Sequence, residues 1–133
     1  LGNHGQNHKS LASLLDVSIE DAEKELTEIE DYIYETYGYE MKYMRPPEGV
    51  YSERALALAQ RMGYKTLFWS FAYADWDVNN QPDKSEAFNK ITANPHSGQI
   101  ILLHAVSETN TAILGDVIDE YRTKGYEFTI PAN

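Results

Sequence analysis

The sequence predicts an α/β fold in which parallel strands alternate with helices. Amphipathic segments with apolar residues three or four positions apart are separated by short apolar runs that end in polar loops. Such alternation is typical of parallel strands joined by right-handed crossovers. Four βα steps in series fit either an α/β barrel or an open doubly wound sheet. A complete barrel usually takes roughly 200 residues or more, so 133 residues would form only part of one.

The first predicted helix begins after Ser18, whose hydroxyl suits a helix cap, and stops at Gly38. One face of this helix is apolar and consists of Ile19, Ala22, Leu26, Ile29, Ile33 and Tyr37. The other face is acidic and consists of Glu20, Asp21, Glu23, Glu25, Glu28, Glu30 and Asp31. We interpret the acidic face as a solvated surface rather than a site.

The next elements alternate in type. Residues 41–44 predict a short strand that runs into residues 45–49, where two prolines prevent a helix and fix a rigid loop. Ser52 caps a second helix that ends at Gly63. Residues 64–70 then predict a buried strand, and an aromatic loop follows it at residues 71–76.

The last third of the chain repeats the alternation. Residues 83–93 predict a helix, and residues 94–98 form its exit turn. Residues 100–103 are the most strand-like run in the chain and lead directly to His104. A final helix is predicted from its apolar residues Leu114, Val117, Ile118 and Tyr121, with Gly125 after it and a last strand near residues 126–130.

Composition narrows the class of partner. The formal net charge is −10, which argues against a nucleic acid or an anionic membrane, because either favours a basic face. No apolar run approaches the roughly 20 residues of a membrane span. Without cysteine there are no disulfides, thiolate metal sites or cysteine nucleophiles. Ten tyrosines and two tryptophans suit a sugar-binding cleft or ordinary core packing.

His4 and His8 are four residues apart near the start of the chain. Two histidines at this spacing point the same way on one helical turn or in a tight loop. Neutral imidazole is the commonest side-chain metal ligand, so the pair would supply two ligands of a divalent ion. The alternative is a solvated N-terminal turn, since the pattern by itself is a weak motif.

The order of the predicted strands indicates on which face of the fold the other polar residues lie. Chemistry in α/β folds gathers at the carboxyl ends of the strands. Arg45 follows the first predicted strand, Asp75 and Trp76 follow the second, and His104 follows the third, so all are expected on one face. His96 precedes its strand and is therefore expected on the opposite face, as a turn residue.

An Asp–His pair is available on that face. Asp75 would orient the ring of His104 and stabilise its protonated form, which makes His104 a candidate general acid. The alternative is a core histidine with its hydrogen bonds satisfied. The guanidinium of Arg45 is suited to hold a catalytic carboxylate in place. The alternative is that Arg45 is a surface cation. Trp76 is either core or a wall that keeps water from the pair.

Four motifs thus follow one another along the chain: His4-x-x-x-His8, Arg45-x-Pro47-x-Gly49, Asp75-Trp76 and Leu102-x-His104. In this order they resemble the polysaccharide deacetylase family, the carbohydrate esterases of family four, which are built on the chitooligosaccharide-deacetylase homology domain. The resemblance covers essentially the whole chain.

Within the family the chain looks most like the peptidoglycan N-acetylmuramic acid deacetylases, which prepare the muramic δ-lactam of spore cortex. Residues 45–54, 68–72 and 102–105 carry this similarity. Many family members have an aspartate three positions before Asp75, where this chain has Ala72. The muramic-type enzymes are apolar there too, so this difference supports the subgroup.

The resemblance implies one catalytic domain over residues 1–133, the C-terminal part of a distorted (β/α) barrel. The family's first motif is an Asp-rich turn that supplies the catalytic base and a third metal ligand, and residues 1–133 contain no counterpart of it. We therefore expect the N-terminal strand or strands and the first motif to lie upstream. An upstream segment or another chain would complete the site.

The resemblance also implies roles for the motif residues. His4 and His8 would bind a divalent metal ion, with zinc expected, and Arg45 would hold the catalytic base. His104, oriented by Asp75, would protonate the departing amine. The acetyl pocket would be shaped by Trp76, Leu102 and Pro47.

The implied activity is metal-dependent removal of acetate from an N-acetylated sugar, with N-acetylmuramic acid of peptidoglycan as the expected substrate. The enzyme would act outside the cell or at the cell wall. Two alternatives stay within the family: a catalytically inactive glycan-binding relative, and a deacetylase of chitooligosaccharide or N-acetylglucosamine. A non-catalytic α/β interaction domain with a coincidental polar rim is a further alternative.

Overall fold

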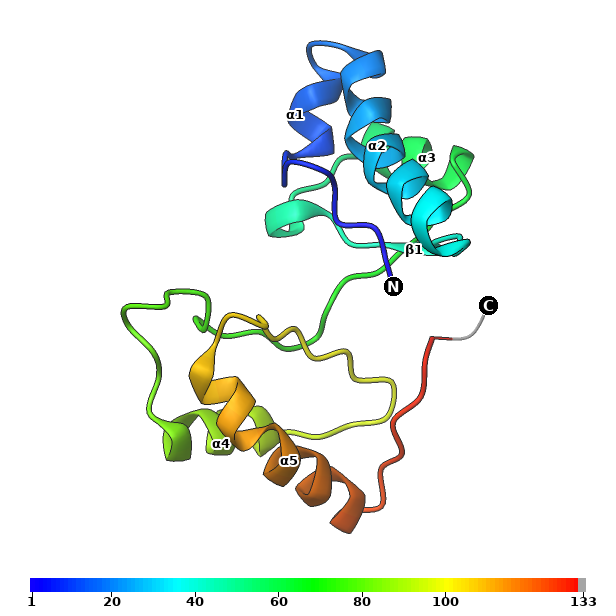
Figure 1. Ribbon diagram of the computed structural model, residues 1–133. Coiled ribbons are helices and arrows are strands. Elements are labelled where there is room, and N and C mark those ends of the chain that lie inside the picture. The colour runs from blue at the N-terminus through cyan, green and yellow to red at the C-terminus, as the bar shows by residue number, and fades with distance from the viewer. Residues whose placement is uncertain (132–133) are drawn as a thin grey trace. The chain divides into compact units, whose positions relative to one another are not determined.

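Helices and very short parallel strands make up the fold in Figure 1, a computed structural model that describes residues 1–131. The chain divides into two compact units, Leu1–Phe68 and the residues from Trp69 onward. Each unit has its own hydrophobic core. The expectation of one catalytic domain over residues 1–133 stays a prediction.

The first unit is built on a small parallel sheet. Strand β1 (Tyr43–Met44) pairs with β2 (Lys65–Thr66), with Met44 opposite Thr66. Asn3 forms a further parallel bridge to Met44, because its N–H donates to the carbonyl of Tyr43 at 2.8 Å and its carbonyl accepts from Arg45 at 2.9 Å. The chain therefore leaves this sheet at neighbouring points after Asn3 and after Met44.

Three helices cover this sheet: α1 (Leu11–Leu15), α2 (Ile19–Tyr37) and α3 (Glu53–Arg61). The prediction of α2 is confirmed at both ends. The Ser18 hydroxyl accepts from the N–H of Asp21, and Gly38 takes the left-handed conformation at φ +64°. Ser52 caps α3 in the same way as Ser18 caps α2. The five-residue α1 was not predicted, since one turn is too short to show a period.

Apolar side chains from these elements form the first core. It consists of Leu11, Leu15, Ala22, Leu26, Met41, Met44, Ala55, Leu58, Ala59 and Tyr64. Burial of such side chains contributes about 25 cal/mol per Å² of apolar surface removed from water. This packing fixes the start of the chain against α2 and β1.

The second unit pairs α4 (Lys84–Thr92) with α5 (Glu108–Thr123), which lie side by side in Figure 1. Their shared core consists of Ala87, Ile91, Ile113, Val117 and Tyr121. The predicted helix at 83–93 is confirmed, with Asp83 as its cap. The last helix is confirmed too, although it begins at Glu108, after its cap Ser107, which is earlier than its apolar residues indicate.

A short parallel contact joins two extended segments in this unit. Phe71 bridges Ile101, and the N–H of Leu102 donates to the Phe71 carbonyl at 2.9 Å. Asp75 follows one segment by four residues, and His104 follows the other by three. Their appearance at the same ends of parallel neighbours is what the strand order predicted.

The predicted strands are shorter than expected. Residues 64–70 contribute only Lys65–Thr66, and Lys65 is exposed, so the buried strand predicted there is wrong in length and burial. Residues 100–103 form one bridge instead of a strand. An apolar run favours an extended backbone, but a strand also needs a partner ladder, and the sequence pattern does not specify one.

The strand predicted at residues 126–130 is also wrong, because this stretch pairs with no strand in the described part of the chain. Side chains hold it instead. The rings of Tyr126 and Phe128 lie 5.8 and 5.9 Å from that of Tyr121, and the Tyr126 hydroxyl donates to the Pro95 carbonyl at 3.0 Å.

Two local interpretations need correction. Residues 45–49 do contain a helical turn, the 3₁₀ turn Pro47–Gly49, because proline is tolerated at the first helical position. The acidic face of α2 is not wholly solvated, since Glu25 is 3% exposed. Within the described residues no helix has the length and apolar character needed to cross a membrane.

Candidate active site

The chain holds two groups of candidate site residues, one in each unit. The first surrounds His4 and His8. Their rings lie 4.9 Å apart between centroids and nearly perpendicular, at 83°. The structure thus brings together the two histidines that the sequence singled out, in a tight loop rather than on a helix.

Backbone contacts set the orientation of His4. Its Nδ1 lies 2.7 Å from the carbonyl oxygen of Arg45. Because a carbonyl oxygen only accepts, we assign the proton to Nδ1, and the lone pair of the neutral ring then lies on Nε2. A ligand histidine is commonly oriented by such a hydrogen bond through its second nitrogen. His4 therefore fits a metal ligand that coordinates through Nε2.

His8 has an unusual backbone. It takes the left-handed conformation at φ +57°, which non-glycine residues seldom adopt. Asn7 before it and Lys9 after it both donate their N–H groups to one carboxylate oxygen of Glu25, at 2.7 and 3.1 Å. The loop is thereby closed around His8, whose side chain is exposed.

The side chains of His4 and His8 are of the chemical type that binds a divalent metal ion. Two neutral imidazoles suit zinc and other first-row metal ions. Within residues 1–131 no cluster of three His, Cys, Asp or Glu side chains is placed to hold an ion. His4 and His8 thus account for two ligands of the expected site.

Arg45 follows β1 and is half-buried. Burial lowers the pKa of its guanidinium. Among the described residues Arg45 forms no salt bridge, and its role of holding a catalytic carboxylate stays a prediction. Pro47 is under 2% exposed at the start of the 3₁₀ turn. Its place in a substrate pocket stays a prediction.

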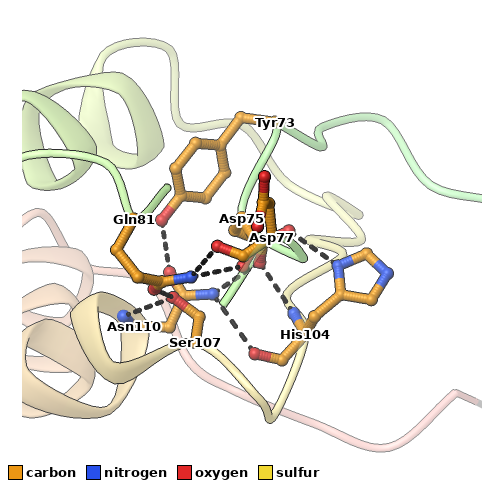
Figure 2. Close-up of polar contacts among 7 residues, drawn as sticks. All are labelled: Tyr73, Asp75, Asp77, Gln81, His104, Ser107 and Asn110. Atoms are coloured by element: carbon orange, nitrogen blue, oxygen red, sulfur yellow. Dashed lines mark hydrogen bonds and ion pairs between the residues drawn. The ribbon is translucent and has the colours of Figure 1, made fainter. Parts of the chain in front are cut away.

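The second group centres on Asp75, which is completely buried. Figure 2 shows its carboxylate between His104 and Asn110. Its Oδ1 lies 2.6 Å from Nδ1 of His104, and its Oδ2 accepts from the His104 N–H at 2.8 Å. A carboxylate only accepts, so we assign the His104 ring proton to Nδ1. The other ring nitrogen, Nε2, points away from Asp75 (Figure 2).

Sequence reasoning missed the residues behind this pair. Asn110 donates through Nδ2 to Asp75 Oδ2 at 2.5 Å, and its own Oδ1 accepts from the Tyr73 hydroxyl. Burial raises the pKa of the Tyr73 hydroxyl, and the negative charge of Asp75 adds to the effect. Tyr73 therefore remains a donor and holds the Asn110 amide in the orientation that serves Asp75.

A further layer anchors the loop that carries Asp75. The Gln81 side chain donates to the carbonyls of Asp75 and Asp77 at 3.3 and 2.7 Å. Its oxygen accepts from the Ser107 hydroxyl at 2.6 Å, and Ser107 also caps α5. One signal was available in the sequence. Asn110 lies three residues before Ile113, on the buried face of α5, where a polar side chain needs a partner.

Three residues of the second unit that the sequence analysis discussed remain: Trp76, Leu102 and His96. The Trp76 ring lies edge-on to that of His104, with centroids 5.8 Å apart, and Trp76 is 58% exposed, which excludes the core alternative for it. Leu102 is half-buried, two residues before His104. His96 lies exposed in the turn after α4, as predicted.

Comparison with known proteins decides the family. A family model described as polysaccharide deacetylase matches residues 1–67 of the 133. The chain belongs to the polysaccharide deacetylase family. The resemblance inferred from the four motifs is thereby confirmed.

One relative of this chain is the peptidoglycan-N-acetylmuramic acid deacetylase PdaA of Bacillus subtilis. It is 39% identical over 129 residues, which are 96% of this chain and 48% of PdaA. The peptidoglycan-N-acetylglucosamine deacetylase PgdA of Listeria monocytogenes is 25% identical over 128 residues, 96% of this chain and 26% of PgdA. The chain thus spans less than half of the length of these two relatives.

Solved structures give the same result for the fold. The structure of Bacillus subtilis PdaA, a family 4 carbohydrate esterase, has a TM-score of 0.86 and 37% identity, covering 96% of this chain and 54% of that one. A family 4 carbohydrate esterase from Bacillus anthracis has a TM-score of 0.75 and 40% identity, covering 96% and 52%. The predicted fold class, part of this esterase fold with parallel strands, is confirmed.

Proposed function

We propose that this chain contributes to an enzyme that removes the N-acetyl group of an amino sugar in peptidoglycan, most specifically N-acetylmuramic acid, and releases acetate. The proposal is supported by family membership and by the similarity to PdaA, which is named for that activity. We further propose that the enzyme works outside the cell or at the cell wall, where this glycan lies.

The observation that carries the proposal is the Asp75–His104 pair. A buried carboxylate with a hydrogen bond to Nδ1 fixes the imidazole ring and its tautomer. His104 keeps 34% of its side chain exposed, and its Nε2 points away from the carboxylate. One ring nitrogen is thus anchored while the other is directed to where a substrate can approach.

This geometry suits amide hydrolysis. An amine leaves an amide poorly unless it is protonated as the C–N bond breaks, so a positioned acid is required. His104 would deliver that proton from Nε2, and Asp75 would stabilise the imidazolium before the transfer. Trp76, edge-on to the same ring, and Leu102 would form the wall around the acetyl group.

His4 and His8 would bind the divalent ion of the reaction, for which two imidazoles fit zinc. When such an ion is bound, its charge supplies Lewis-acid polarisation of the amide carbonyl. The chain's own contribution is to orient the two rings through the Arg45 carbonyl and the loop around His8. Arg45 would hold a carboxylate that acts as the base.

A second candidate function is glycan binding without catalysis. It is favoured by one observation: the described residues offer neither a third acidic or imidazole ligand beside His4 and His8 nor a carboxylate paired with Arg45. A binding protein would retain the aromatic wall of Trp76 and would release no acetate. Acetate release from N-acetylmuramoyl glycans, compared with release from N-acetylglucosaminyl glycans, distinguishes the two candidate substrates.

The first test is His104→Ala in the natural protein that carries this chain. We expect turnover of N-acetylmuramoyl glycan to fall by on the order of 10²–10⁴, the usual worth of a general acid. Acetate release is the measurement. His96→Ala, the exposed turn histidine of the same unit, is the matched control and should retain full activity. Equal activity of the two variants would remove His104 from the chemistry, and no acetate from the unmodified protein would favour glycan binding.

A further inference from the structure

Glu25 is a buried acidic residue in the middle of α2 to which the proposed function gives no role. Only 3% of it is exposed. A buried carboxylate is costly unless polar partners replace water. The neighbouring acids of the same helix are less buried, Glu23 being half-buried and Glu28 exposed.

Among the described residues, the hydrogen-bond partners of the Glu25 carboxylate all come from the loop that carries His8. Oε1 accepts the backbone N–H of Asn7 at 2.7 Å and that of Lys9 at 3.1 Å, and Oε2 accepts from Asn7 Nδ2 at 3.2 Å. The Glu25 carbonyl also accepts the N–H of Gln6 at 2.9 Å. One residue of α2 therefore holds both neighbours of His8.

His8 has a backbone conformation that requires stabilisation by its surroundings. Its φ of +57° is a conformation that a residue with a Cβ adopts at a cost, and it persists only when the surroundings fix it. The two N–H groups that flank His8 can converge on one oxygen only while the backbone is folded around it. In this conformation the His8 ring lies 4.9 Å from that of His4.

Gly5 completes the fit on the other side of the loop. It has φ +79°, and a Cβ placed on it would lie 2.6 Å from Glu25 Oε1. A side chain at this position would therefore displace the Glu25 carboxylate, and glycine also suits the positive φ. Sequence, backbone and buried acid agree on one arrangement of the segment from His4 to Lys9.

We propose that Glu25 is a positioning residue that fixes His8 in its left-handed conformation and so turns its ring toward His4. The use of the two rings as metal ligands rests on the proposed function, whereas the positioning itself does not require a metal. Glu25 would act through hydrogen bonds to the loop, without contacting the ion.

The test compares three variants of α2 in the whole chain. Glu25→Met keeps the length of the side chain and removes both acceptors, so it would be tolerated if Glu25 served only to fill space. Glu25→Gln keeps one oxygen that can accept both backbone N–H groups. Glu28→Met makes the same change at an exposed position of the same helix and is the matched control.

Two measurements made without metal test whether Glu25 positions His8. Amide hydrogen exchange reports on the N–H groups of Asn7 and Lys9, and nuclear Overhauser contacts report on the two histidine rings. In Glu25→Met we expect at least a tenfold loss of protection at both amides and loss of the ring contact. Glu25→Gln should retain part of each, and Glu28→Met should match the unmodified chain. Far-ultraviolet circular dichroism checks that α2 stays folded.

A zinc titration followed by the ¹⁵N shifts of the rings links the result to the metal. We expect the His8 shift at a given zinc concentration to be smaller in Glu25→Met than in the control. Protected amides and an intact ring contact in Glu25→Met would overturn the positioning role. Ring nitrogens of the unmodified chain that do not respond to zinc would instead contradict the proposed metal function, while exchange and ring contact still decide on Glu25.

Discussion

Asp75 shows how a carboxylate without exposure to water is kept in one orientation. Two side chains and one backbone group donate to it, namely Nδ1 and the N–H of His104 and Nδ2 of Asn110. The Asn110 amide is in turn fixed by the Tyr73 hydroxyl. A buried polar network of this kind stabilises only if each member is satisfied. Asn110 is therefore expected to matter although it lies behind the pair.

Asn110→Leu tests this network by stability. The substitution leaves both Asp75 and Tyr73 short of a buried partner, so we expect a loss of about 1–3 kcal/mol in the free energy of unfolding. Tyr73→Phe removes the other end of the contact. Because the two residues act on each other directly, their effects should be coupled by about 0.5–3 kcal/mol in a double-mutant cycle measured by urea unfolding. Strictly additive effects would show that Tyr73 does not orient Asn110.

The sequence could predict which site residues meet, but not what holds them. Asp75 and His104 were expected together because both follow parallel segments, and this needs only strand order. Asn110 and Glu25 escaped because their value depends on burial, which comes from tertiary packing. The periodicity of α2 hinted at Glu25, which lies three residues after Ala22 and next to Leu26 on the buried side. It could not show that the loop of residues 7–9 would donate hydrogen bonds to the Glu25 carboxylate.

At the scale of elements, α2 is fixed to the sheet by polar contacts as well as by its apolar face. The Tyr64 hydroxyl, at the start of the strand segment, donates to Glu30 Oε2 at 2.9 Å and accepts from Asn3 Nδ2 at 3.0 Å. Glu30 also accepts the N–H of Met41 at 3.0 Å. A single hydroxyl thus joins the first segment of the chain, the helix and the sheet.

Tyr64→Phe tests this junction and has a pH signature. Burial raises the pKa of Tyr64 to about 12, the Asn3 hydrogen bond opposes this, and Glu30 adds to it. An unfolded tyrosine ionises near pH 10. Between about pH 10 and 12 the unfolded chain therefore loses a proton that the folded chain keeps, so stability falls as the pH rises through this interval.

The expected result is a difference between the two proteins. At neutral pH the variant should be less stable by about 1 kcal/mol, because a buried hydrogen-bond pair is lost. From pH 9 to pH 11 the unmodified chain should lose more stability than Tyr64→Phe, since the other tyrosines contribute equally to both. Urea unfolding at the two pH values measures this. If the two proteins lost the same stability between pH 9 and pH 11, the raised pKa would not belong to Tyr64.

For the whole molecule, the sequence predicted the helices well and the strands poorly. The ends of α2 were set by local chemistry, the Ser18 hydroxyl and the left-handed Gly38, which the sequence shows directly. Strand length depends on a partner ladder that can come from anywhere in the chain. The runs at 100–103 and 126–130 have the composition of strands, yet they form one bridge and a set of ring contacts respectively.

The metal site also depends on the whole molecule, because its ligands must come from more than one segment of the chain. A zinc site in a protein is usually four-coordinate, and a catalytic one takes three ligands from the protein. His4 and His8 supply two, and no third acidic or imidazole ligand joins them within residues 1–131. An ion held by two imidazoles keeps most of its water. Zinc binding by residues 1–133 alone should therefore be weak.

We expect the binding free energy of zinc to residues 1–133 to lie well below the roughly 10–16 kcal/mol of four-ligand structural sites. Competition with a chromophoric chelator measures it, with His4→Ala and His8→Ala each abolishing the response and His96→Ala leaving it unchanged. A protein that adds a carboxylate ligand to these two imidazoles, as the proposed function requires, should bind zinc more tightly, because the carboxylate displaces water and brings charge. Tight stoichiometric binding by residues 1–133 alone would contradict the two-ligand reading and require a third ligand among residues now assigned to the surface.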